Sequence, residues 1–395
     1  MGEYAKLLAK SASEWDCPDL MESVYKASGK KIPFDSPSLN WATYGGIPRA
    51  AMTVFHGYPG GGKTSSAMNL CKNAITLFLE EYSAELHELE EKAAAGKKEA
   101  KIALSDLKER GPKKVLYLDL EHSFDKKWAK VIGLNVDDLD IMQPPNVKAE
   151  AILQRIVEII ETGEVGLLVV DSVPSVVTGS ELEKKIGERT VAGLAGVMTE
   201  FCRKVIQLLV RYDCTLLLIN QVRVNMNNPY IEQTPGGEAI KFYASLIMSF
   251  RLGSPVDFMG NEIAMKSDNP AGYKITVRLV KQKSASFDRK KGEYFLLAQS
   301  GIRVDFEYGI LAIEKYGIII KNKAWFTICD PRTKEPLEKD GDIVKVNGQV
   351  KVYDYLQANP EYYKELCEVI TEDINKDGLE IDSEDTVEDK VFMNE

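Results

Sequence analysis

A glycine-rich run near residue 60 combines the residue types that bind phosphate groups. The pattern G-x-x-x-x-G-K-[ST] is matched by Gly57, Tyr58, Pro59, Gly60, Gly61, Gly62, Lys63 and Thr64, and Ser65 follows it. Glycines let backbone N–H groups surround a phosphate, Lys63 can reach the outer phosphates, and the Thr64 hydroxyl can bind Mg²⁺. A chance glycine turn is the alternative, but an apolar segment precedes the run and a helical pattern follows it. The pattern therefore predicts a site for a nucleoside triphosphate with Mg²⁺.

Three later apolar segments end in polar side chains that could act on a bound triphosphate. Asp171 could hold Mg²⁺ beside the glycine-rich run, and Gln221 could hydrogen-bond the γ-phosphate. Glu121 could orient water and accept its proton, an effect of about 10²–10⁴ in rate, with Asp119 as a competitor on the same segment. Each is also compatible with an ordinary surface residue or a turn cap. Their order after a phosphate-binding run favours the functional interpretation.

Apolar strands that alternate with helices must position these side chains. Strands are predicted at residues 51–56, 115–120, 166–170 and 215–219, and helices at 65–80, 149–162 and 194–211. This alternation is typical of an α/β fold whose parallel sheet is covered on both faces. Ligands of such sheets bind at the carboxyl ends of the strands, where the candidates fall. Residues 273–281 and 294–297 are predicted to be antiparallel edge strands.

Changes in composition divide the chain into segments. Residues 1–35 are predicted to be a helical arm with an extended end, and Ser36-Pro37 is a turn signal. A core over 36–300 is interrupted by a Glu-, Lys- and Ala-rich insertion at 80–112, which predicts an exposed helical hairpin. That hairpin fits a solvated elaboration better than a dedicated partner site. A small mixed unit follows over 301–370, with helices around 310–316 and 361–371.

The final segment, residues 371–395, is an acidic tail that we expect to be disordered. This segment contains ten acidic residues and two lysines, so the tail carries −8 of the net charge of −10. The nearly neutral remainder permits nucleic-acid binding without requiring it. The tail is either solubilising or, as we favour, a polyanion that competes with DNA, mainly duplex, for basic surface.

Cysteine usage and hydropathy exclude several classes of protein. Six cysteines lie far apart and only three histidines occur, which argues against a zinc site or a disulfide framework and favours buried, reduced thiols. No apolar run approaches the roughly 18 residues that span a bilayer, and residues 1–6 lack a signal-peptide pattern. These features predict a cytoplasmic protein without a membrane partner.

Several segments, taken together, resemble the RecA family of homologous-recombination ATPases, which includes bacterial RecA and phage UvsX. The similar segments are 38–40 with 45–49, Glu121-His122-Ser123-Phe124-Asp125, Asp171-Ser172-Val173, the most specific stretch 234–245, and Trp325-Phe326 with 350–360. The similarity covers nearly the whole chain apart from 80–112. It implies a RecA-type P-loop core with a mostly parallel sheet, an N-terminal arm used in oligomerisation and a small α+β C-terminal domain.

The resemblance also implies a role for individual residues in an ATP site with Mg²⁺. Glu121 would be the catalytic base and Gln221 the γ-phosphate sensor, while Asp125 and Trp128 would lie near the adenine. The family usually has Tyr where Trp128 stands, so an aromatic face is kept. Lys281 and Lys283, separated by Gln282, would reach the ATP of a neighbouring subunit, and Phe242 would couple ATP to the state of a filament.

Two loops would bind DNA. The first spans residues 181–190 and includes Arg189, although Val197 stands where bacterial RecA has a basic residue and one residue is added near 191–192. The second spans 222–237 and is a polar, flexible run directly after Gln221, with Arg223, Asn225, Asn227, Asn228, Gly236 and Gly237 as its candidates. Ordering of this loop on DNA could couple DNA binding to the triphosphate. An ordinary long surface loop is the alternative.

The resemblance implies a DNA-dependent ATPase that forms filaments on single-stranded DNA and catalyses homologous pairing and strand exchange in recombination and repair. Its partners would be single-stranded and double-stranded DNA, further copies of itself, and single-strand-binding or mediator proteins. Two alternatives stay open. A ring-forming helicase or packaging motor would use the same core, but Lys281 and Lys283 favour the recombinase. A regulatory ATPase that does not bind DNA is disfavoured by the polar loop after Gln221.

Overall fold

A computed structural model describes residues 30–145, 147–182, 193–225, 228–233, 235–283 and 288–375. It describes only the backbone of residues 181–182, 223–225 and 228–233. The expected N-terminal arm up to residue 29, Arg189, Asn227 and most of the acidic tail lie outside these ranges. No helix in the described ranges is long and apolar enough to cross a membrane.

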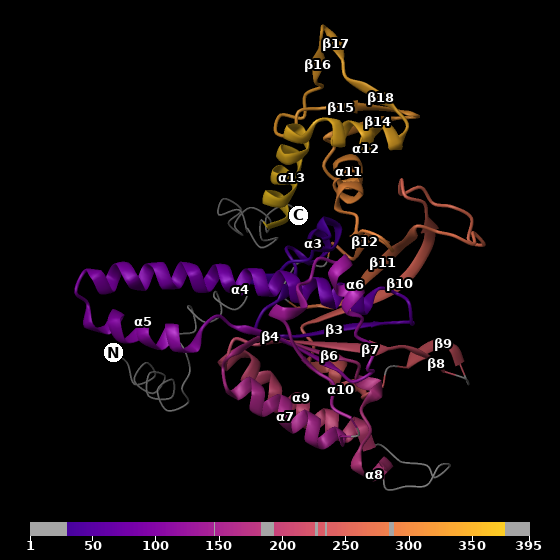
Figure 1. Cartoon of the computed structure of the whole chain (residues 1–395). Helices are drawn as coiled ribbons and strands as arrows, with labels where there is room; N and C mark the ends of the chain where they lie inside the picture. The colour runs from indigo at the N-terminus through magenta and orange to yellow at the C-terminus, as the bar shows by residue number, and fades with distance from the viewer. Residues whose placement is uncertain are drawn as a thin grey trace, which may run out of the picture.

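A nine-stranded sheet forms the centre of the molecule (Figure 1). Its order is β13-β12-β11-β10-β3-β7-β6-β4-β5. The six strands from β10 to β5 pair in parallel, and β11, β12 and β13 add antiparallel edges, as expected for a mostly parallel sheet. The bounds are β3 Met52–Gly57, β4 Lys114–Asp119, β5 Asp140–Met142, β6 Val165–Asp171, β7 Thr215–Gln221, β10 Leu246–Val256, β11 Gly272–Gln282, β12 Lys291–Leu297 and β13 Gly301–Ile302.

Helices cover both faces of this sheet because successive strand side chains point to opposite sides. Phe55 and Tyr117 pack in one core with α4, whereas Val54 and Leu116 pack in the other with α7 and α9. Helices α7 and α9 lie below the sheet in Figure 1. The helices of the core are α3 Pro37–Thr43, α4 Lys63–Ala94, α5 Lys98–Arg110, α6 Lys126–Val131, α7 Ala149–Glu161, α8 Gly179–Leu182, α9 Gly193–Arg211 and α10 Glu238–Tyr243, with short 3-10 helices at Val136–Asp138 and Val173–Ser175.

The predicted helical hairpin is present, and its first arm is the phosphate-loop helix itself. Helix α4 runs for 32 residues without a break and α5 returns beside it, so the pair projects from the core at the left of Figure 1. Ala100 and Leu107 are buried between the arms, and Lys108 pairs with Glu90 at 2.8 Å. The sequence predicted an end of the first helix near residue 80, because its apolar positions become sparse there.

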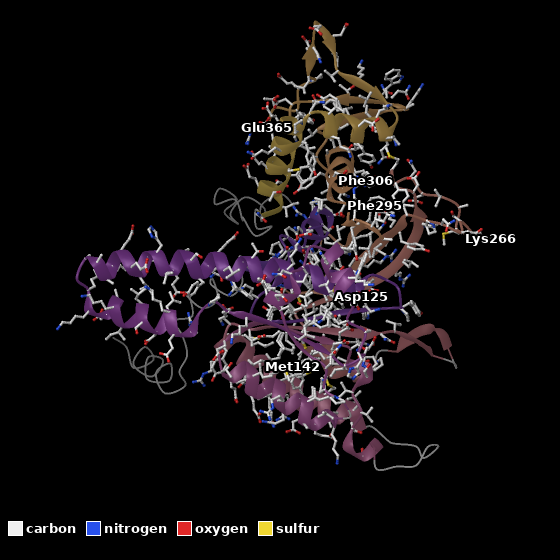
Figure 2. The ribbon with its side chains drawn as sticks, viewed as in Figure 1. Asp125, Met142, Lys266, Phe295, Phe306 and Glu365 are labelled. Atoms are coloured by element: carbon white, nitrogen blue, oxygen red, sulfur yellow. The ribbon has the colours of Figure 1, made fainter. Side chains whose placement is uncertain are left out.

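Residues beyond the sheet form a small mixed unit with its own core at the top of Figure 1. It contains α11 Val304–Glu314, α12 Gln349–Ala358, α13 Pro360–Asn375, a sheet of β14 Ile319–Asn322, β15 Trp325–Ile328 and β18 Lys345–Asn347, and a pair β16 Glu338–Lys339 and β17 Asp342–Ile343. It meets the sheet where Phe295 of β12 and Phe306 of α11 pack edge to face, 5.6 Å between centroids (Figure 2). The ring of Tyr353 stacks obliquely on Phe306.

The structure corrects two expectations, and it shows the extended end of the predicted arm as a strand. Ser36-Pro37 does not form a turn: Ser36 caps α3 by accepting a hydrogen bond from Leu39 N, and proline suits the first position of a helix. The expected disordered tail begins too early at 371, because α13 continues to Asn375 and buries Ile374. Strands β1 (Lys31–Ile32) and β2 (Ile47–Pro48) pair antiparallel, so the extended end of the predicted arm is tied to the core.

Candidate nucleotide-binding site

The phosphate-binding run connects the end of β3 to the start of α4, as its pattern requires. Gly57, Gly60 and Gly62 have φ of 151°, 75° and 86°, values that side chains disfavour. A Cβ on Gly57 would lie 2.2 Å from the carbonyl oxygen of Phe250, whereas Gly60 faces open space. The dipole of helix α4 favours an anion at this end, and no acidic residue in the first turn of the helix opposes it.

Lys63 lies inside this loop. Its Nζ donates hydrogen bonds to the carbonyl oxygens of Gly57 at 3.0 Å and Tyr58 at 2.8 Å. Burial lowers the pKa of the Lys63 ammonium, and the nearby carboxylates of Asp171 and Glu121 act against that shift. The two loop carbonyls thus hold the cation at the centre of the loop.

Asp171 ends β6 and meets two hydroxyl groups. Thr64 Oγ1 donates to Asp171 Oδ2 at 3.0 Å, and Tyr117 OH donates to the same oxygen at 2.6 Å. Burial raises the pKa of the Asp171 carboxyl, and both hydroxyls oppose that effect. Burial also holds the pKa of Tyr117 well above its ordinary value, so this hydroxyl keeps its proton and is the donor. Sequence reasoning missed Tyr117, because a tyrosine in an apolar strand is typical of a hydrophobic core.

Glu121 and Gln221 come together as predicted. Gln221 Nε2 donates to Glu121 Oε1 at 2.6 Å, and Ser172 Oγ donates to the same oxygen. Glu121 lies beyond the end of β4, where its backbone N–H and that of Leu120 donate to the carbonyl oxygen of Asp171. The candidate base, the candidate sensor and the candidate metal carboxylate therefore belong to one hydrogen-bonded cluster.

Asp119, the competitor for the role of base, has a structural role. It is fully buried, accepts hydrogen bonds from the backbone of Ser123 and Phe124, and accepts another from Gln143 Nε2 at 2.8 Å. These bonds hold the turn that carries Glu121 away from the strand. The carboxylate available for chemistry on this segment is Glu121.

Asp125 and Trp128 lie beside the start of α4. Asp125, which is labelled in Figure 2, caps α6 by accepting hydrogen bonds from the backbone N–H groups of Lys127 and Trp128. The indole Nε1 of Trp128 donates to Ser65 Oγ at 2.9 Å. A half-buried aromatic ring is thus fixed next to the phosphate loop, at a position suited to stacking on a base.

The paired lysines lie at the end of β11. Lys281 Nζ donates to the carbonyl oxygens of Lys241 and Phe242, each at 2.7 Å, and so binds the last turn of α10. Burial, with a smaller effect of Lys283, lowers the pKa of Lys281. Lys283 is exposed, and Phe242 on α10 is 72% exposed. In this single chain Lys281 binds the end of α10, and its expected reach toward a neighbouring subunit stays a prediction.

The second predicted DNA loop contains a hairpin. Strands β8 (Arg223–Asn225) and β9 (Asn228–Gln233) pair antiparallel, where the sequence predicted only a flexible loop. Gly236 and Gly237 then start α10 with φ of 87° and 79°, and a Cβ on Gly236 would lie 2.5 Å from Ile240 Cδ1. Packing thus already accounts for these glycines. Asn220 Nδ2 donates to the carbonyl oxygen of Pro235 at 2.8 Å and anchors this return to β7.

The donor set beside the loop fits a magnesium ion. The Thr64 hydroxyl and the Asp171 carboxylate are hard oxygen ligands on adjacent elements, and Mg²⁺ is commonly bound by one or two carboxylates together with substrate phosphates. Elsewhere, the described residues contain no group of three or more His, Cys, Asp or Glu that could hold a metal.

A strand–loop–helix motif with Lys63 and Thr64, at the carboxyl edge of a mostly parallel sheet, defines a P-loop protein of the α/β class. A family model of the RecA N-terminal domain matches residues 87–303. RecA of Aquifex aeolicus is 28% identical over 367 residues, covering 92% of this chain and 89% of that protein, and RecA of Clostridium perfringens SM101 is 30% identical over 276 residues, covering 69% and 73%. RecA of Campylobacter jejuni 81-176 is 30% identical over 278 residues, covering 68% and 72%.

The chain belongs to the RecA family and is an ATP-dependent recombinase of recombination and repair. The family model starts inside the helical hairpin, after the phosphate loop. The alignment with the Aquifex aeolicus protein covers so much of this chain that it includes the loop as well.

Proposed function

We propose that this chain hydrolyses ATP with Mg²⁺ in a DNA-dependent manner, forms filaments on single-stranded DNA and catalyses homologous pairing and strand exchange. The observation that carries the proposal is the cluster of Lys63, Thr64, Glu121, Asp171 and Gln221 at one edge of the sheet. Single-stranded and double-stranded DNA and other copies of the chain are its proposed partners, single-strand-binding or mediator proteins are further candidates, and the cytoplasm is its proposed location.

In this proposal the loop backbone, Lys63 and the start of α4 bind the phosphates, and Trp128 and Asp125 contact the adenine. A magnesium ion held near Thr64 and Asp171 would neutralise phosphate charge. Glu121 orients water and accepts its proton, and Gln221 moves its amide from Glu121 to the γ-phosphate. Ser172 keeps its hydroxyl on Glu121 and so limits the orientations of the carboxylate.

The position of the hairpin β8–β9 between Gln221 and α10 supports the proposed DNA dependence. A change at Gln221 acts directly on Arg223 and Asn225 in the next strand, and the anchor from Asn220 to Pro235 fixes the far end of the segment. Arg189, Asn227 and Asn228 complete the proposed DNA contacts. Gly236 and Gly237 form the turn into α10 and stay among the proposed DNA contacts, through their backbone.

We propose that assembly uses the N-terminal arm and the exposed end of α10. We propose residues 1–35 as the oligomerisation arm, 36–300 as the ATPase core with 80–112 as an insertion, and a C-terminal domain that extends from 301 to 375. In a filament, Lys281 would exchange the carbonyls of α10 for phosphate of the adjacent subunit, with Lys283 beside it and Phe242 in the interface.

Glu121→Gln tests the catalytic assignment. The amide keeps the size of the side chain but cannot accept a proton from water, so we expect ATP binding within about twofold of the wild type and a loss of about 10²–10⁴ in turnover. Nucleotide binding by fluorescence and phosphate release with single-stranded DNA are the measurements. Glu161→Gln, an exposed carboxylate at the end of α7, is the matched control. Wild-type turnover in Glu121→Gln would remove Glu121 from the mechanism.

A further inference from the structure

We propose that Tyr117 is a positioning residue for the metal site, where its hydroxyl fixes the orientation of the Asp171 carboxylate. The inference rests on the proposed function, because it takes Asp171 as the carboxylate that holds Mg²⁺. It concerns a residue that the phosphate-loop motif does not contain. The two residues come from the adjacent parallel strands β4 and β6, near the end of the sheet that β5 forms.

The register of the sheet explains how the two side chains meet. Tyr117 on β4 lies opposite Val169 on β6, and Asp119 lies opposite Asp171, so the tyrosine is one pleat repeat behind the carboxylate on the same face. Its long side chain covers that distance and brings the hydroxyl to 2.6 Å from Asp171 Oδ2. Both residues are almost completely buried, at 0% and 2% exposure.

A purely structural role for the tyrosine is the competing interpretation. Its ring does pack in the core, edge to face with Phe124 at 5.1 Å between centroids. The same core also contains Phe55 and Phe250, which fill comparable strand positions without a hydroxyl. Packing therefore accounts for the ring of Tyr117. The hydroxyl is accounted for by its acceptor, the carboxylate at the nucleotide site.

The two hydroxyls have complementary effects on the metal site. Thr64 donates its proton to Asp171 Oδ2, which directs the lone pairs of Thr64 Oγ1 away from the aspartate. Tyr117 donates to the same oxygen, but from a strand of the sheet rather than from α4. Among the described residues, no donor contacts Asp171 Oδ1. The arrangement reserves Oδ1 and the lone pairs of Thr64 for the metal ion and its water.

A hydrogen-bond donor that fixes a metal-binding carboxylate typically contributes 10- to 100-fold to metal affinity. Without the tyrosine hydroxyl, the Asp171 carboxylate would rotate about its side-chain bonds. Its hydrogen bond from Thr64 Oγ1 to Oδ2 would then be formed for a smaller fraction of the time. The expected consequence is a higher Mg²⁺ requirement for tight nucleotide binding. Binding of nucleotide without Mg²⁺ should not change, because Tyr117 does not contact the phosphate loop.

Tyr117→Phe in the full-length chain tests this inference. The probe is a fluorescent, non-hydrolysable ATP analogue, titrated with Mg²⁺ and, separately, bound in excess EDTA. Tyr362→Phe is the matched control, since it removes another hydroxyl bonded inside the protein, to the carbonyl oxygen of Cys329 in the C-terminal domain. We expect Tyr117→Phe to raise the half-saturating Mg²⁺ concentration about tenfold or more, with affinity in EDTA within twofold of wild type.

A second comparison separates this inference from the proposed metal site. Asp171→Asn should raise the Mg²⁺ requirement strongly, and adding Tyr117→Phe to it should have little further effect. If Asp171→Asn shifts the Mg²⁺ requirement and Tyr117→Phe does not, the role of Tyr117 is overturned and the metal site stands. If Asp171→Asn leaves the Mg²⁺ requirement unchanged, the proposed metal site itself is overturned and the role of Tyr117 with it. An equal effect of Tyr117→Phe and Tyr362→Phe would also overturn the inference.

Discussion

At the scale of single residues, the glycines of the phosphate loop have different reasons to be glycine. Gly60 and Gly62 both have positive φ, so any side chain there meets backbone strain. Around Gly60 there is open space, but a Cβ on Gly62 would lie 2.5 Å from the hydroxyl of Tyr294. That hydroxyl bonds to Ser66 Oγ at 2.8 Å, so the packing continues into the first turn of α4.

Gly60→Ala and Gly62→Ala form a matched pair that separates strain from packing. Each alanine should cost about 1–2 kcal/mol from the left-handed backbone alone. Gly62→Ala must also displace Tyr294, so we expect a lower melting temperature and weaker nucleotide binding than for Gly60→Ala. Thermal unfolding and nucleotide titration measure the two effects. Equal losses in both variants would show that the contact with Tyr294 does not restrict position 62.

The residues of the site were predictable to different degrees. Lys63, Thr64 and Asp171 follow from the motif and from an apolar strand with a polar end, and the structure brings them together with Glu121 and Gln221. The resemblance already assigned Glu121 as the base, and the fold adds the reason why Asp119 does not compete. Only the folded turn shows that both oxygens of the Asp119 carboxylate accept hydrogen bonds from backbone N–H groups.

At the scale of elements, most core strands and helices were predicted because their apolar patterns are long. Strand β10 was missed, since Arg251, Gly253 and Pro255 interrupt its pattern although it pairs with both β3 and β11. The hairpin β8–β9 was missed because polar residues dominate it. The pattern of α4 was followed only to residue 80, because Phe78 is the last buried residue of this helix.

Helix α10 connects the proposed sensor strand to an exposed surface. Asn220 fixes the turn before it through Pro235, and Lys281 binds the carbonyl oxygens of its last turn. A cation at a helix C-terminus is favourable and satisfies carbonyls that have no partner within the helix. With six residues, this helix depends on such end contacts.

Lys281→Ala should therefore loosen α10, whereas Lys283→Ala should not. We expect faster amide hydrogen exchange over residues 238–243 in the first variant and wild-type exchange in the second. Nucleotide binding by the single chain should stay within about twofold of wild type in both, because neither lysine contacts the phosphate loop. Hydrogen exchange followed by mass spectrometry resolves this segment, and unchanged exchange in Lys281→Ala would contradict the account of α10.

At the scale of the whole molecule, a buried carboxyl group joins the ATPase core to the C-terminal domain. Glu307 of α11 is 1% exposed and accepts hydrogen bonds from Ser36 Oγ and from Ser38 N, at the start of α3. Its other oxygen has no partner among the described residues. Burial raises the pKa of Glu307 well above its ordinary value of 4.5 despite these bonds.

This raised pKa makes the junction less stable as the pH rises. The folded protein binds the proton of Glu307 more tightly than the unfolded chain does, so its stabilising effect is complete below about pH 4.5 and is lost as the pH rises toward the folded-state pKa. Glu307→Gln imitates the protonated form at every pH. The difference between the melting temperatures, variant minus wild type, should therefore increase between pH 5 and pH 8. A difference that does not vary with pH would contradict this assignment.

We propose that the site at Gly57–Thr64 belongs to a filament-forming, DNA-dependent ATPase. The most direct test is the ATPase rate of the wild-type chain with and without single-stranded DNA, combined with electron microscopy of the same samples. We expect strong stimulation by single-stranded DNA and helical filaments on it, both weakened by salt because phosphate contacts dominate DNA binding. A rate that is indifferent to DNA, or closed rings in place of filaments, would contradict the account.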